Sequence, residues 1–186
     1  IWKQRVQRIQ IFKVKDGING EEGDPNYDLY RLSMRVSAKR LFPNYSFLDA
    51  PFNAMYYKEG KPETEVGYMG CRTRVLANVY NKRKQITYGR GNLSFTSINL
   101  PRIALKCKGD MEVFYKLLDE QLKLVHRQLK NRFEVQCKKK VKNYPFLMGQ
   151  GIWIDSDKLT AEDTVGEILK NGSLTTGFIG LAEALI

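Results

Sequence analysis

The first part of the chain shows short stretches of periodic hydrophobic positions separated by irregular segments. Apolar and β-branched residues alternate roughly over 9–15 (IQIFKVK), which predicts a strand. Asp24 and Pro25 then predict the N-cap and first turn of a helix that continues to about Leu41. Residues 44–70 carry aromatic, Gly and Pro residues without a clear period and predict a long loop. The apolar positions that support the helix are Leu29, Leu32 and Val36.

The middle of the chain has the clearest periodicity. Residues 92–100 (NLSFTSINL) alternate well enough to predict a strand, and Pro101 then opens a helix. Asp110 predicts the N-cap of a second, long helix. The apolar residues that lie on one face of this helix are Val113, Phe114, Leu117, Leu118, Leu122, Val125, Leu129 and Phe133.

The last part of the chain again alternates between predicted strands and helices. Residues 145–154 (PFLMGQGIWI) predict a buried strand, and a loop and a short amphipathic helix follow, ending at Gly172. Residues 173–185 (SLTTGFIGLAEAL) predict a strand that passes through a glycine turn into a helix. This alternation indicates an α/β sheet or barrel. We expect residues 1–186 to form a single segment, within which about 54–91 is an insertion.

Composition narrows the classes of protein that fit. The chain has 186 residues, of which 42% are hydrophobic and 11% aromatic, enough for a globular core. No apolar run approaches the roughly 20 residues that cross a bilayer, and no signal-peptide pattern is visible, so we expect a cytoplasmic protein without membrane contact. The chain does not begin with Met and ends within a helical pattern, from which we expect a fragment.

The formal net charge of +11 is the strongest feature of the composition. It would suit a polyanionic partner, either nucleic acid or a small phosphorylated substrate. A basic surface that serves only solubility would explain the net charge equally simply. A basic nucleic-acid-binding module therefore stays an alternative function, and its affinity for DNA would fall steeply with added salt.

The cysteines and the single histidine disfavour several kinds of site. Cys71, Cys107 and Cys137 are widely spaced and include no C-x-x-C pair, which argues against a disulfide framework and a zinc knuckle. With His126 as the only histidine, we expect no metal site in this segment. Cys107 is expected to pack within a helix, and Cys137 is expected to be an incidental thiol.

Cys71 stands apart because it lies in GYMGCRTR, on a predicted turn. Arg72 and Arg74 would favour a thiolate nucleophile there, but a nucleophile also needs a base, and His126 belongs to the long helix. A structural role is also poorly supported, because no periodic apolar neighbours would bury this thiol. From the residues alone, a functional and an incidental Cys71 stay equally open.

Two glycine-containing segments are candidate anion sites. GRGN at 89–92 is similar to part of a phosphate-binding loop, although a plain turn explains it as well. In SLTTGFIG, hydroxyls and glycines between a strand and a helix would offer free backbone N–H groups to an anion. A turn without a ligand is the other explanation.

Four segments can be compared together: DGINGEEGDPNYDLYRLSMRVSAKRLFP, MGCR, GRGNLSFTSINLPRIAL and SLTTGFIGLAEAL. Together they resemble the anaerobic, class III ribonucleoside-triphosphate reductases. They occur in the order and with the spacing of that family, from about Ile9 to the end of the chain. The resemblance implies that this segment is the later half of a ten-stranded α/β barrel and that the insertion is a finger loop carrying Cys71.

The resemblance also assigns roles to residues. Cys71 would become a thiyl radical that abstracts the 3′-hydrogen of a ribonucleotide. Asn92 would orient the ribose hydroxyls, since an amide can donate and accept hydrogen bonds at once. Thr175, Thr176 and Gly177 would lie near the substrate phosphates.

The function implied is reduction of ribonucleoside triphosphates to deoxyribonucleoside triphosphates by a glycyl/thiyl radical mechanism without oxygen. The radical glycine and a zinc site would lie outside this segment, which is therefore incomplete on its own. Formate as reductant, ATP and dATP as effectors, a radical-S-adenosylmethionine (iron–sulfur) activating enzyme and a homodimer are also implied, and nucleic acid is not an expected partner. A glycyl-radical enzyme with a non-nucleotide substrate is the remaining alternative.

Overall fold

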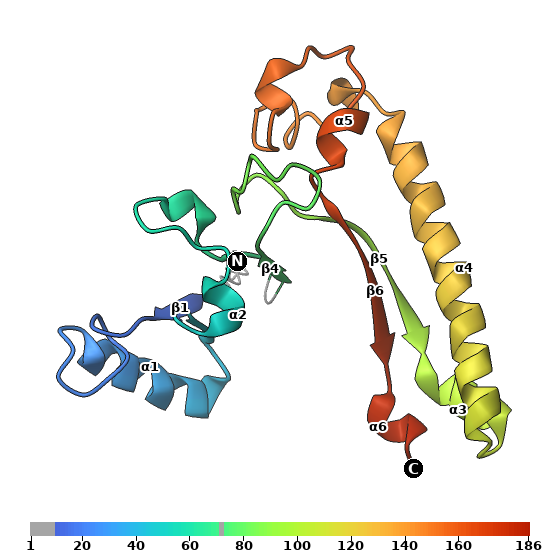
Figure 1. The fold of residues 1–186 in the computed structure, drawn as a ribbon, viewed down its shortest axis with the longest axis horizontal. Coiled ribbons are helices and arrows are strands. Elements are labelled where there is room, and N and C mark those ends of the chain that lie inside the picture. Colours follow the sequence, from blue (N-terminus) through green and yellow to red (C-terminus); the bar gives the residue numbers. More distant parts are fainter. Residues whose placement is uncertain (1–9, 71–72) are drawn as a thin grey trace, which may run out of the picture. The chain divides into compact units, whose positions relative to one another are not determined.

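A computed structural model describes residues 10–70 and 73–186 of the chain. The chain forms two compact units, Ile1–Tyr88 and Gly89–Ile186. In Figure 1 the first unit runs from blue to green and the second from green to red. Both units combine helices with two-stranded sheets, which confirms the α/β content, whereas the ten-stranded barrel and the finger-loop insertion stay predictions. None of the helices within the described ranges has the length and apolarity needed to cross a bilayer.

The first unit is built on two parallel strands joined by a helix. β1 (Ile11–Val14) pairs with β2 (Asn44–Phe47), and α1 (Tyr27–Arg40) connects them. The predicted strand and helix are therefore confirmed. The prediction of a long loop over 44–70 is wrong, because this stretch contains β2 and several other short elements. They are α2 (Pro51–Ala54), a 3₁₀-helix (Pro62–Thr64) and β3 (Gly67–Met69).

Helix α1 begins two residues later than the sequence predicts. Asn26 is the N-cap, and the carboxylate of Asp24 instead accepts a hydrogen bond from Glu21 N (2.9 Å), which closes the preceding turn. At the other end, Leu41 adopts a left-handed conformation (φ 61°) and donates its N–H to Ser37 O (2.8 Å). A left-handed residue ends a helix by satisfying its last carbonyls, and here Leu41 has this role.

The apolar positions of α1 are not the ones it buries. Leu29 and Leu32 are each 50% exposed, whereas Ser33 is buried. The helix packs on the sheet through aromatic contacts, with the Tyr30 ring 6.0 Å from the rings of Phe12 and Tyr45. The periodicity therefore predicts the helix correctly but does not identify the face that packs on β1 and β2.

A short hairpin follows in the first unit. β3 pairs antiparallel with β4 (Thr73–Val75), with Gly67 opposite Val75 and Met69 opposite Thr73. Residues 71–72, between these strands in the sequence, lie outside the described part of the chain. At the base of the hairpin, a Cβ on Gly67 would lie only 2.8 Å from Thr87 O, so a residue without a side chain is required there.

The second unit contains a longer parallel pair, β5 (Asn92–Asn99) and β6 (Ser173–Ile179). α3 (Leu100–Cys107) follows β5 directly, and α4 (Met111–Cys137) runs beside the two strands (Figure 1). Both helices begin as predicted. The side chain of Asn99 accepts a hydrogen bond from Arg102 N (3.0 Å), and that of Asp110 accepts one from Val113 N (3.1 Å).

The core of this unit lies between β5, α3 and α4. The predicted apolar face of α4 supplies two buried side chains, Val125 and Leu129, while Leu122 nearer its start is 40% exposed. Partly buried Phe114, Leu117 and Leu118 pack against the same cluster. The buried members of the cluster are Ile98, Leu100, Ile103, Val125 and Leu129.

The prediction of a buried strand over 145–154 is wrong: Met148, Trp153 and Ile154 are buried, but Phe146 is 66% and Ile152 42% exposed. The chain turns back on itself here, because Met148 N and Gly149 N both donate to Tyr144 O (2.9 and 3.1 Å). A Cβ on Gly149 would lie 2.5 Å from Pro145 O, so the turn depends on glycine. Buried Trp153 then donates its indole N–H to Ile168 O (2.9 Å) in α5 (Gly166–Leu169).

The end of the chain agrees with its predicted pattern. β6 leads through Gly180, which has a positive φ of 73°, into α6 (Leu181–Ala184). A Cβ on Gly180 would lie 2.4 Å from Cγ of Pro101 in α3. Gly180 therefore provides both the left-handed turn and the close approach of α6 to α3.

Candidate active site

Cys71 lies outside the described residues, so its role stays a prediction. The structure does describe the elements that flank it in the sequence. β3 ends at Met69, Gly70 follows with φ 60°, and β4 begins at Thr73. The predicted turn is therefore flanked by the two strands of an antiparallel hairpin.

Asn92 is the first residue of β5 and is half-buried. Its amide oxygen is buried and has no hydrogen-bond partner among the described residues. Leaving a buried acceptor unpaired costs about 1–3 kcal/mol, so such an atom requires an explanation. A bound molecule with a hydroxyl or amide donor would satisfy it. Among the described side chains, the other buried polar atom without a hydrogen-bond partner is Gln136 Oε1 on α4.

The turn that leads into Asn92 is held in place by three hydrogen bonds. Ile154 N donates to Gly89 O (2.7 Å), and Ser173 N donates to Gly91 O (2.9 Å). Between them, Arg90 Nε donates to Asn171 O (3.1 Å), and partial burial lowers the pKa of this guanidinium. GRGN therefore acts as a turn whose carbonyl groups and arginine bond to protein, which does not resemble a phosphate-binding loop.

Thr175, Thr176 and Gly177 lie within β6. The prediction that these residues stand between a strand and a helix N-terminus is therefore wrong. They pair in register with Phe95, Thr96 and Ser97 of β5. The strand-to-helix turn falls later, at Gly180, and α6 has only four residues. Whether these residues bind substrate stays a prediction.

The strand geometry also separates the two threonines. Successive residues of a strand point to opposite faces, so Thr175 and Thr176 cannot both face one ligand on the same side of the sheet. Thr176 shares its face with Thr96, whose Oγ1 lies 3.2 Å from Gln128 Oε1 on α4. Thr175 is on the opposite face, together with Phe95. Thr176 and Gly177 instead both line an apolar pocket between α3, α4 and α6.

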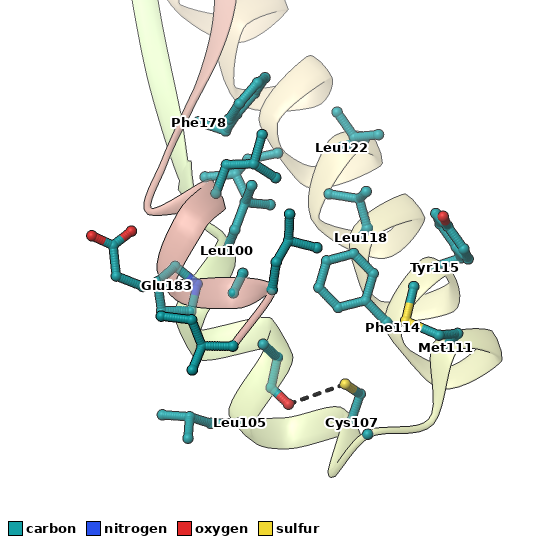
Figure 2. A pocket seen from close by; sticks show the side chains of 18 of the residues that line it. Leu100, Leu105, Cys107, Met111, Phe114, Tyr115, Leu118, Leu122, Phe178 and Glu183 are labelled. Carbon is teal, nitrogen blue, oxygen red and sulfur yellow. Dashed lines mark hydrogen bonds between the residues drawn. The ribbon is translucent and has the colours of Figure 1, made fainter.

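An apolar pocket with a volume of about 900 Å³ opens between α3, α4 and α6 (Figure 2). Its walls include Leu100, Phe114 and Leu118, and in Figure 2 the carboxylate of Glu183 points away from these side chains. Sites for phosphorylated ligands need converging polar groups. This pocket therefore does not fit the predicted substrate.

The other two cysteines are held within helices. Cys107 is buried, as predicted for a packing residue, and its Sγ donates to Ala104 O of the same helix (3.0 Å; Figure 2). Cys137 is half-buried with its Sγ 3.8 Å from Gly166 O, and burial raises the pKa of its thiol. Among the described residues, no group of three or more His, Cys, Asp or Glu could hold a metal ion.

Cys137 is expected to react slowly with iodoacetamide at pH 7, because its raised pKa leaves less of the reactive thiolate. Raising the pH from 7 to 9.5 should accelerate the reaction, and unfolding the chain in urea should abolish the protection. Mass spectrometry of the peptide that contains residue 137 measures the rate. Equal rates in the folded and unfolded chain would contradict the expectation.

Comparison with known proteins gives a consistent result. A family model described as anaerobic ribonucleoside-triphosphate reductase matches residues 7–186. A protein of that name from Escherichia coli (strain K12) is 37% identical over 177 residues, covering 94% of this chain and 24% of the relative. The proteins of the same name from Haemophilus influenzae and Enterobacteria phage T4 are 34% and 30% identical. The chain spans about a quarter of the length of these relatives.

Proposed function

The chain belongs to the anaerobic ribonucleoside-triphosphate reductase family, and we propose that it forms part of an enzyme that reduces ribonucleoside triphosphates to deoxyribonucleoside triphosphates. The observation that carries this proposal is the match over residues 7–186, because it includes both Cys71 and Asn92. Since the chain corresponds to about a quarter of its relatives, the activity is proposed for the complete enzyme.

In the proposed reaction, Cys71 acts as a thiyl radical. Its sulfur takes the hydrogen atom from C3′ of the ribose, so that a C–H bond breaks, an S–H bond forms and the unpaired electron moves to C3′. A glycyl radical outside this segment, formed by an activating iron–sulfur enzyme, would generate the thiyl radical. Hydrogen-atom transfer needs no general base, so Cys71 could act without the single histidine.

The overall reaction balances with formate as the reductant. Formate and one proton would supply two electrons and two hydrogens, the 2′-hydroxyl would leave as water, and carbon dioxide would be released. After the first step, Cys71 would return the hydrogen atom to C3′ of the product, so that the S–H bond breaks and the thiyl radical is restored. Asn92 is suited to binding the ribose hydroxyls. Its buried amide oxygen has no described protein partner and could accept a hydrogen bond from one of them.

Asn92→Ala in the complete enzyme is expected to lower kcat by about 10²-fold, the usual scale for one lost transition-state hydrogen bond in an active site. Nucleotide binding should weaken much less. The matched control is Gln136→Ala, which removes the other buried unpaired amide oxygen and should leave kcat unchanged. Anaerobic turnover assays measure both. Equal effects of the two variants would contradict a role for Asn92 in the reaction.

Two alternatives from the sequence have weaker support. Nucleic-acid binding rests on the net charge of +11 alone. A glycyl-radical enzyme with another substrate would not be expected to match the reductase model over nearly the whole chain. The deciding experiment is anaerobic turnover by the complete activated protein with ribonucleoside triphosphates and formate, in parallel with a screen of non-nucleotide substrates. Deoxynucleotide formation supports the proposal, and turnover of only a non-nucleotide substrate overturns it.

A further inference from the structure

We propose that Tyr68 and Arg74 are positioning residues that anchor the hairpin flanking residues 71–72 and thereby set where Cys71 can act. This inference rests on the proposed role of Cys71 in the reaction. Tyr68 in β3 and Arg74 in β4 are direct cross-strand partners. In the sequence, each stands three positions from Cys71, on opposite sides of it.

The hairpin cannot fix its own position. β3 and β4 contain three residues each, and an isolated two-stranded hairpin is marginally stable at best in water. Its location must therefore depend on contacts with the rest of the first unit. Gly70 and residues 71–72 are all that separate the two strands in the sequence, so Cys71 is linked covalently to the end of β3 and to the start of β4 within two residues of each.

Tyr68 provides the first anchor. Its hydroxyl donates a hydrogen bond of 2.7 Å to Ser46 Oγ. Ser46 lies in β2 and is only 1% exposed, so the acceptor belongs to the buried part of the unit. A hydrogen bond to a buried, well-fixed partner restrains the tyrosine ring more strongly than a contact with a surface side chain would.

Arg74 provides the second anchor through a relay of two hydrogen bonds. Its Nη1 donates to Asn53 Oδ1 (2.9 Å), and Asn53 Nδ2 donates to Phe47 O (2.8 Å). Asn53 lies in α2 and is 3% exposed, and both ends of its amide are occupied by these bonds. The relay therefore connects β4 to the end of β2.

A ring contact fixes the plane of the Arg74 guanidinium. It lies over the Phe52 ring, with Cζ 5.0 Å from the ring centroid. A planar guanidinium can stack on an aromatic ring and donate to an amide oxygen at the same time, which a lysine ammonium cannot reproduce. Both strands of the hairpin therefore contact the rest of the first unit. β3 is bonded to β2 through the hydroxyls of Tyr68 and Ser46, and β4 is bonded to α2 through the guanidinium of Arg74.

The test uses the complete enzyme and two variants that remove the same hydrogen bond from either side, Tyr68→Phe and Ser46→Ala. Each is expected to lower kcat about tenfold with KM changed less than about twofold, because substrate binding is left intact. The double variant should be no slower than either single one, as expected for partners in one bond. Arg74→Lys should also lower kcat, whereas Arg35→Lys on the exposed surface of α1 should not.

A second measurement is independent of catalysis. Amide hydrogen exchange in 67–75 is expected to accelerate in Tyr68→Phe and Arg74→Lys, while exchange in α4 stays unchanged. Unchanged exchange, or kcat values equal to those of Arg35→Lys in an enzyme that makes deoxynucleotides, would overturn the inference and leave the proposed function standing. A wild-type enzyme that turns over no ribonucleotide would instead refute the proposed function, and the exchange data would still report on the anchors.

Discussion

Cys71→Ser in the complete enzyme is expected to abolish deoxyribonucleotide formation, lowering turnover by more than about 10³-fold, the scale of losing a group that reacts covalently. Serine has nearly the same size as cysteine, so the site should keep its shape. Its O–H bond is much stronger than an S–H bond, however, so a serine cannot carry the radical. Nucleotide binding, measured by equilibrium dialysis, should therefore stay close to that of the wild type.

Cys137→Ser is the matched control for this variant. Cys137 is a half-buried thiol on α4 that has no proposed part in the reaction, so its replacement should leave turnover unchanged. Retained turnover in Cys71→Ser would refute the thiyl mechanism. If nucleotide binding disappeared together with turnover, the role proposed for Cys71 would also be refuted, because the residue would then be needed for the shape of the site.

Leu129→Ala is expected to lower the free energy of unfolding of the chain by about 2–5 kcal/mol. Leu129 is only 5% exposed and packs with Ile98, Ile103 and Val125 in the core of the second unit. Removing most of its side chain loses apolar burial and leaves a cavity that helices α3 and α4 cannot fully close. Urea denaturation measures the change in free energy.

Leu124→Ala provides the comparison on the same helix. Leu124 is 47% exposed, so its truncation should destabilise the chain by less than about 1 kcal/mol. The comparison requires equal denaturant slopes for the two variants, since a changed slope indicates a change in the unfolded or native state. Similar losses at both positions would show that the core does not lie where the structure places it.

The parts of the fold that could be predicted are those specified by local chemistry. Asp110 caps α4 through its own side chain, Pro101 lies in the first turn of α3, and the apolar stripe of α4 continues for several turns before it reaches Leu129. Such signals lie within a few residues of the structure they specify. The strand at 92–100 and the helix that follows it were therefore visible without knowledge of their packing partners.

The sequence-based predictions fail where contacts between distant residues or the backbone conformation determine the structure. Only part of the apolar run at 145–154 is buried, at Met148, Trp153 and Ile154, and Gly149 lets the chain turn back where a strand would continue. In the first unit, the buried positions Ser46 and Asn53 are polar, because they hold the hairpin and not because they fill a core. Hydrophobic periodicity carries no signal for either kind of position.

The residues of the candidate site also fall into those that a local motif predicts and those whose position depends on distant strand pairing. Short motifs, MGCR and GRGNL, predict the roles of Cys71 and Asn92 through the resemblance, whereas the unpaired oxygen of Asn92 follows from the packing around β5. The resemblance of SLTTGFIG to a reductase segment predicts that Thr175 and Thr176 serve one site near the substrate phosphates. Their assignment to opposite faces follows from the pairing of β6 with β5, which no local pattern specifies.

The pairing of β5 with β6 joins segments far apart in the sequence, as the bond between Arg90 and Asn171, 81 residues apart, shows. A ribosome adds about 5–20 residues per second, so β5 would emerge about 4–16 s before its partner strand. Throughout that interval, the nascent chain would present an unpaired strand edge with Phe95 beside it. Within the second unit, α3 and α4 are synthesised during this interval and could pack on β5 before β6 is available.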